Sequence, residues 1–234
     1  QAGDQEYFSD GLTEDIITQL AKIKAFKVTS RTSIMKYKDN KKSLKEIGNE
    51  LGASIILEGS VQKSGDKVRI TAQLINARND EHLWAETYDR TLDDIFTIQT
   101  DIATKIASAL KANLSAEEEQ GISKKYTLNT EAYQLYLQGR YEWNKRLEAP
   151  VRKSIDFFKQ AIAMDSTYAL AYAGLGDAYL MLGVYSSLRP DESFPVGKMY
   201  AEKALQLDPS LAEAYATSID IHIHYDWDAD AAEK

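Results

Sequence analysis

The chain has 234 residues, of which 44% are hydrophobic and 27% are charged, a composition typical of soluble globular domains. It contains no cysteine, which excludes disulfides, thiolate metal sites and cysteine nucleophiles. It also has no apolar run of about 18 residues that would span a membrane. The net charge of −8 argues against nucleic-acid binding by the surface as a whole. Because the sequence begins at Gln1 rather than Met, we expect it to be part of a longer protein.

The first predicted elements are a helix and a short strand. Leu12, Ile16 and Leu20 lie at helical spacing, which predicts a helix over residues 12–23. Residues 26–31 have the composition of a short strand. The first half of the chain therefore mixes helix and strand from its beginning.

The next apolar residues change from helical spacing to a period of two, which is typical of strands. With the polar Ser64-Gly65-Asp66-Lys67 turn, this change predicts a β-hairpin whose second strand continues into a third. The elements are a helix over 43–51 that stops at Gly52, strands over 55–61, 68–74 and 81–88, and a helix over 93–114. The predicted fold class of this half is α/β or α+β, with a small mixed sheet that includes a three-strand meander.

The second half is predicted to be entirely helical, and it repeats itself. Residues 157–166 align with residues 200–209, and both segments end in Asp followed by a residue that breaks the helix. This pattern resembles the tetratricopeptide repeat, a helix–turn–helix unit of about 34 residues. The resemblance implies an all-α superhelix with two whole repeats and a truncated third. Prolines in the segment 183–197 predict an unusually long link between two of its helices.

Four segments of the first half carry a second resemblance. They are YFSDGLTEDI at 7–16, LEGSV at 57–61, VRITAQLI at 68–75 and HLWAETYDR at 82–90. These segments are similar to the TolB-N-terminal-like domain that precedes tetratricopeptide repeats in bacterial class III adenylate cyclases and winged-helix regulators. The resemblance implies an α/β domain over 1–116, a linker over 117–128 and helical repeats over 129–234.

The same resemblance implies that the output domain and a membrane helix lie outside this region. It places the region in the periplasm, with the cytoplasm as the alternative. Members of the family also carry an apolar strand before the position of Gln1. A second copy of the chain, in a homodimer, is a candidate to fill that edge of the sheet.

No set of side chains in the sequence points to catalysis. Asp93 and Asp94 are the only adjacent aspartates, and they fit the start of a helix better than a two-metal site. His222 and His224 point to nearly opposite sides of a helix, so they do not share an ion there. We therefore predict no catalytic residue, no metal site, no cofactor and no enzymatic activity for this region. A contribution to cyclase catalysis stays open as an alternative.

The main functional prediction is a non-catalytic region of a bacterial signalling protein that binds a protein or peptide partner. Tetratricopeptide arrays bind peptides in a concave groove, and the resemblance implies that Tyr136, Arg140, Tyr172 and Tyr179 are partner-binding candidates. Lys145 and Arg146 follow Arg140 along the chain and add two further cations for clamping an acidic segment.

The alternative function is a sensor of small molecules or anions in the α/β half. Gly11 lies in a polar segment, residues 9–14, which we interpret as a loop that offers backbone N–H groups to an anion. Lys27 and Arg31 belong to a run of nine basic residues between positions 22 and 45 and are possible anion contacts. An ordinary solvated surface is the competing interpretation of this run.

Overall fold

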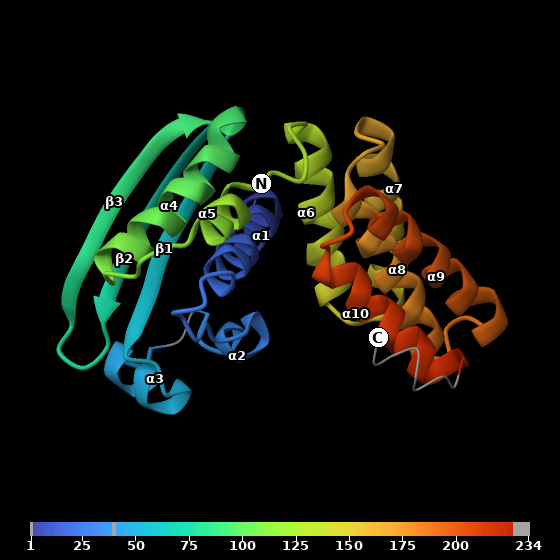
Figure 1. Cartoon of the computed structure of the whole chain (residues 1–234), viewed down its shortest axis with the longest axis horizontal. Coiled ribbons are helices and arrows are strands. Elements are labelled where there is room, and N and C mark those ends of the chain that lie inside the picture. The colour runs from blue at the N-terminus through green and yellow to red at the C-terminus, as the bar shows by residue number, and fades with distance from the viewer. Residues whose placement is uncertain (1, 39–40, 227–234) are drawn as a thin grey trace. The chain divides into compact units, whose positions relative to one another are not determined.

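The computed structural model describes residues 2–38 and 41–226 and forms two compact units, Gln1–Lys125 and Tyr126–Lys234 (Figure 1). We call them the sheet unit and the helical unit. The sheet unit contains helices α1 (Ala2–Ala21), α2 (Arg31–Met35), α3 (Leu44–Leu51), α4 (Ile95–Ala109) and α5 (Ala116–Ser123), the 3₁₀ turn η1 (Leu92–Asp94), and strands β1 (Ile55–Ser64), β2 (Lys67–Asn76) and β3 (Glu81–Thr91).

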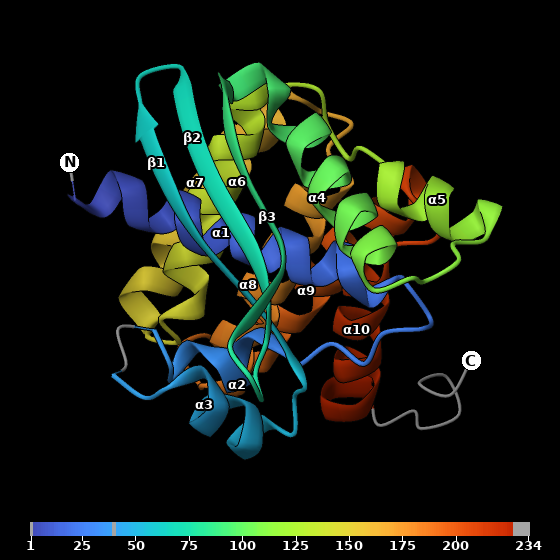
Figure 2. The ribbon, with the colours of Figure 1, turned by 90° about the vertical axis from the view of Figure 1, so that its left-hand side faces the viewer.

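The three strands form an antiparallel sheet in the order β1-β2-β3. Gly65 adopts a φ of 59° in the two-residue turn of the predicted hairpin, a conformation that costs glycine little. The inward residues of β2 are at most 4% exposed, because α1 and α4 cover one face of the sheet. Figure 2 looks onto the other face, where polar pairs such as Thr71 and Thr87 join neighbouring strands. The predicted meander is confirmed.

The start of α1 differs from the prediction. The helix begins at Ala2 rather than at residue 12. Phe8 is fully buried and lies one turn before Leu12, so the apolar stripe begins earlier than predicted. The segment 9–14 is therefore helix and not the predicted loop.

The predicted strand over residues 26–31 is also wrong. The chain runs from α1 to α2 without regular structure at 26–30, and Arg31 begins α2. A strand needs a hydrogen-bonding neighbour, and the described residues pair only β1, β2 and β3. The sheet described here is accordingly antiparallel rather than mixed.

The other helices of this unit show how local signals set helix ends. Ser43 and Glu46 form a reciprocal capping box at the start of α3, and Gly52 ends the helix with a φ of 65°. Helix α4 stops at Ala109, five residues before the predicted end, and Lys111 adopts a φ of 55° just beyond it.

Most of the predicted linker belongs to helix α5. This helix packs on α1 and α4. Glu118 accepts a hydrogen bond of 2.8 Å from the backbone N–H of Lys24, which ties α5 to the segment after α1. The hydrogen bond from the Ser115 backbone, together with the one from Lys24, holds the pKa of Glu118 below its usual range.

The helical unit stacks neighbouring helices along the chain (Figure 1). Its elements are α6 (Thr130–Asn144), α7 (Glu148–Met164), α8 (Ala169–Val184), α9 (Pro190–Leu207), α10 (Ala212–Ile221) and the π-helical turn η2 (His222–Asp226). The aligned segments end alike. The backbone N–H of Asp165 donates to the carbonyl of Ala161, and that of Asp208 donates to Ala204. Among all the described residues, no helix has the length and hydropathy of a transmembrane span.

The long link predicted between helices over 183–197 is wrong. Helix α8 continues to Val184, and α9 begins at Pro190. A proline at the first helical position loses no hydrogen bond, because that N–H has no partner within the helix. Pro195 lies inside α9. Only residues 185–189 connect the two helices.

Candidate functional site

A buried carboxylate links three helices of the helical unit. Asp177 on α8 lies 3.5 Å from Nη1 of Arg140 on α6, and its other oxygen accepts a hydrogen bond from the hydroxyl of Thr217 on α10. Burial raises the pKa of Asp177, and the positive charge of Arg140 opposes this effect only in part. The carboxylate therefore joins α6, α8 and α10 and holds Arg140 against α8.

Two guanidinium groups lie over one indole ring beside this carboxylate. The Cζ atoms of Arg140 and Arg146 are 4.4 Å and 3.6 Å from the Trp143 ring centroid. Arg146 also reaches α8, where its Nη1 is 3.6 Å from the sulfur of Met181. We call Arg140, Trp143 and Arg146 the Arg–Trp cluster. Cation–π contacts of this kind hold a guanidinium group against the face of an aromatic ring.

The cluster also contains a donor without an acceptor. Trp143 is only 9% exposed, and its Nε1–H is buried without a hydrogen-bond partner among the described residues. A buried N–H without a partner costs free energy, which an acceptor oxygen would recover. The neighbouring acid Glu142 is already engaged by Lys145 at 2.8 Å and Lys153 at 2.9 Å. The Trp143 N–H and the neighbouring guanidinium groups therefore favour an oxygen acceptor at this position, preferably an anionic one.

The structure does not bring the four predicted partner-binding residues onto one face. Tyr136 lies one turn before Arg140 and packs between the rings of Phe158 and Tyr168. Tyr172 and Tyr179 instead face Tyr200 of α9, with ring centroids 6.5 Å and 5.8 Å from it. Asp177 follows Tyr172 by five positions, which turns it roughly 140° around α8.

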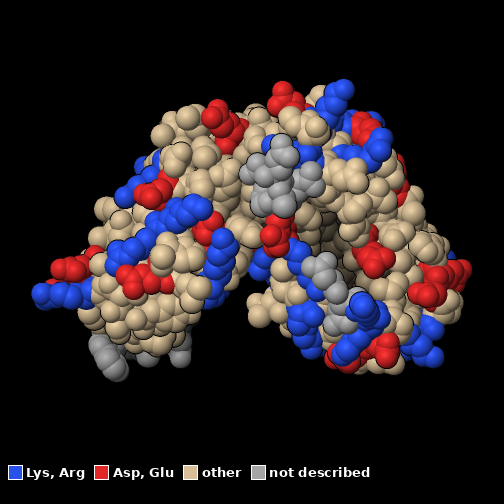
Figure 3. All heavy atoms as spheres, turned by 180° about the vertical axis from the view of Figure 1, so that it is seen from behind, with Lys and Arg blue, Asp and Glu red and all other residues tan. Residues whose placement is uncertain are grey.

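The three predicted anion contacts are not assembled for an anion. Gly11 is buried inside α1, where its N–H is part of the helix rather than of a helix start. Arg31 faces two carboxylates of α1, Asp10 at 3.6 Å and Glu14 at 3.4 Å. Lys27 is exposed on the segment between α1 and α2. On the face shown in Figure 3, acidic residues lie among the basic ones.

Asp177 and Thr217 are the site residues that sequence reasoning missed. One signal was available for Asp177, since it is the only charged residue in the otherwise apolar and small-residue segment 169–184. No comparable sequence signal marks Thr217, because its role depends on the packing of α10 against α8. Within the described residues no three His, Asp or Glu side chains are grouped to hold a metal ion.

The chain is similar to a curated protein. No family model matches the chain. Over 219 residues, 92% of its length, the chain is 32% identical to the protein named "Putative adenylate cyclase 3" of Rhizobium meliloti (strain 1021). The chain spans 37% of the length of that relative. The predicted association with adenylate cyclases is supported at this level, whereas the TolB-like and tetratricopeptide assignments stay predictions.

Proposed function

We propose that the helical unit is a tetratricopeptide-type array that binds an acidic peptide segment, in a non-catalytic region of a bacterial signalling protein. The Arg–Trp cluster is the binding site, and Asp177 positions Arg140 within it. The similarity to a protein named as an adenylate cyclase supports the further proposal that the parent protein carries a cyclase domain outside this region.

The Trp143 N–H, which is buried and has no hydrogen-bond partner in the described part of the chain, is the observation that carries this proposal. A carboxylate offers about four acceptor positions, enough to take this N–H and a guanidinium donor together. Charge-assisted hydrogen bonds of this kind are about twice as strong as neutral ones. Glu142, the chain neighbour of Trp143, is already paired with Lys145 and Lys153, so its negative charge is compensated.

The repeated helix ends support the array assignment. Asp165 and Asp208 each cap a turn by accepting the backbone N–H two residues later, from Thr167 at 2.9 Å and Ser210 at 3.1 Å. The same chain geometry thus recurs at equivalent places, as a repeat requires. Small residues at the crossings allow close packing, since a Cβ at position 176 would lie only 3.2 Å from the carbonyl oxygen of Gly197.

The test is a binding measurement on matched acidic and neutral peptides. Fluorescence anisotropy would compare labelled peptides rich in Asp and Glu with the same peptides carrying Asn and Gln. We expect saturable binding of acidic peptides only, and a loss of roughly tenfold for Arg146→Gln, which removes one charge-assisted contact. Arg189→Gln is the matched control, because Arg189 is an exposed arginine that pairs with Asp191.

Two outcomes would overturn the proposal. One is the absence of saturable binding by any acidic peptide to the intact chain. The other is equal binding by the wild type and Arg146→Gln, which would place the peptide elsewhere on the molecule.

A further inference from the structure

The Arg–Trp cluster already has a carboxylate beside it. Asp177 lies 3.5 Å from Nη1 of Arg140, and the two side chains are only 18% and 15% exposed. The same guanidinium lies over the Trp143 ring, with its Cζ 4.4 Å from the ring centroid. One group therefore contacts both Asp177 and the ring whose N–H would receive the ligand. A carboxylate bound at the cluster would have to share Arg140 with Asp177.

Two helices bring charged groups to the Asp177 carboxylate. Arg140 and Arg146 of α6 act on it as positive charges, and Glu213 of α10 acts on it as a negative charge. The faces of α7 and α9 that pack on α8 instead carry the Phe158 ring and the small Gly197. While Asp177 is ionised, two arginines thus face two carboxylates. The cluster then has little net positive charge to offer an acidic ligand.

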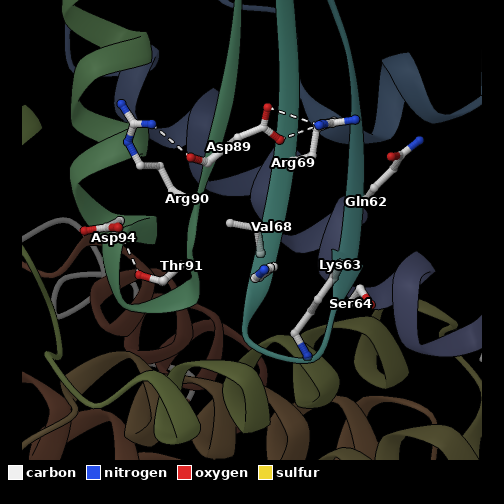
Figure 4. Close-up of a pocket in the computed structure, with 10 residues that line it drawn as sticks. Gln62, Lys63, Ser64, Val68, Arg69, Asp89, Arg90, Thr91 and Asp94 are labelled. Atoms are coloured by element: carbon white, nitrogen blue, oxygen red, sulfur yellow. Dashed lines mark hydrogen bonds and ion pairs between the residues drawn. The ribbon is translucent and has the colours of Figure 1, made fainter.

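An exposed pair of the same kind in the sheet unit behaves differently. Arg69 and Asp89 join β2 to β3 through hydrogen bonds of 2.6 Å and 3.2 Å (Figure 4). Their side chains are 60% and 59% exposed, and Arg69 holds the pKa of Asp89 below its usual range. Asp177 also has an arginine partner, yet burial raises its pKa. A negative charge at position 177 is therefore costly, and a second anion nearby would increase that cost.

We propose that Asp177 controls the affinity of the Arg–Trp cluster by competing with the acidic segment for Arg140. This inference rests on the proposed function and adds its regulation. The ionised Asp177 is an internal counterion that weakens binding, and its protonated form opens the cluster to a ligand. By linkage, a bound anion and a proton on Asp177 favour each other.

The first test compares charge variants of the full chain by fluorescence anisotropy at pH 7.5 and constant ionic strength. The probe is a labelled peptide rich in Asp and Glu. Asp177→Asn removes the charge and keeps an acceptor for the Thr217 hydroxyl, so it should bind the peptide roughly tenfold more tightly than the wild type. Asp89→Asn is the matched control. It takes the same charge from an exposed arginine pair and should leave the affinity unchanged.

A second test uses the wild type and does not depend on how a variant folds. The carboxyl ¹³C signal of Asp177 reports its pKa in the free chain and in the chain saturated with peptide. Binding should raise this pKa, because the bound anion disfavours the ionised form. Equal affinities of the wild type and Asp177→Asn, an equal gain in Asp89→Asn, or a pKa that does not change on binding would each overturn this inference and leave peptide binding intact. The absence of saturable peptide binding by the wild type and Asp177→Asn alike would overturn the proposed function together with it.

Discussion

Replacing Gly139 with Ala should destabilise the helical unit, although alanine is the better helix former. The reason is the ring of Phe158, which is fully buried between α6 and α8. A Cβ built on Gly139 would lie 2.5 Å from Cε1 of Phe158, and one on Gly174 would lie 2.7 Å from Cζ of the same ring. The ring is thus held between two glycines and has no room to move away from either helix.

The magnitude follows from two opposing effects. Alanine gains about 1 kcal/mol over glycine inside a helix. Overpacking a filled core costs about 1–3 kcal/mol. The net effect of Gly139→Ala is therefore a loss of up to about 2 kcal/mol in the free energy of unfolding. In a Phe158→Ala background the clash disappears, and the same substitution should stabilise by about 1 kcal/mol.

A double-mutant cycle by urea denaturation measures this change of sign. Phe158→Ala alone costs about 3–5 kcal/mol, so the cycle is run with trimethylamine N-oxide to keep all variants folded. Gly121→Ala in α5 is the control, because its Cβ would meet only Lys22 Cδ at 3.7 Å, and it should stabilise. Equal effects of Gly139→Ala in both backgrounds would refute the packing account.

Three further predictions concern single residues. The raised pKa of Asp177 makes the folded state bind its proton more tightly, so this residue's contribution to stability falls as pH rises from the ordinary aspartate range through the raised pKa. The urea midpoint of Asp177→Asn should not show this fall with rising pH, and a pH profile identical to that of the wild type would contradict the assignment. Gly65→Ala forces a side chain into a positive φ and should cost about 1–2 kcal/mol in thermal unfolding, whereas a neutral effect would argue against the two-residue turn. Ser43→Ala removes the α3 cap and should cost about 1 kcal/mol, and Glu46→Gln should reduce the loss of stability as pH falls, because Ser43 lowers the pKa of Glu46. Parallel losses for both variants at all pH values would contradict the capping role.

The elements that the sequence predicts correctly depend on neighbours along the chain. The capping box at Ser43, the stop at Gly52 and the hairpin turn at Gly65 each act within a few residues. The amphipathic spacing of α4 is equally local. Such signals can be read from one sequence because the interactions they reflect join residues close in number.

The errors arise where the structure depends on distant parts of the chain. Residues 26–31 have strand-like composition, but no strand among the described residues pairs with them. The polar residues around Gly11 look like a loop, yet Phe8 and Leu12 extend one buried stripe through them. Pro190 suggests a break and in fact begins a helix.

The candidate site shows the same division. Arg140 and Arg146 are close along the chain, so a pair of cations could be predicted from the sequence. The ion pair between Arg140 and Asp177 joins α6 to α8 and could not be predicted from the sequence. The contacts of Tyr172 and Tyr179 with the ring of Tyr200 join α8 to α9 and are likewise not predictable from neighbours along the chain.

The most direct measurement of the central proposal is the NMR signal of the Trp143 indole N–H. The chain has three tryptophans, and Trp143→Phe identifies the signal by its loss. Addition of an acidic peptide should move this signal downfield in a saturable way, with the dissociation constant found by anisotropy, since the N–H gains an acceptor. A Trp143 signal that stays in place while the peptide saturates the protein would contradict the account.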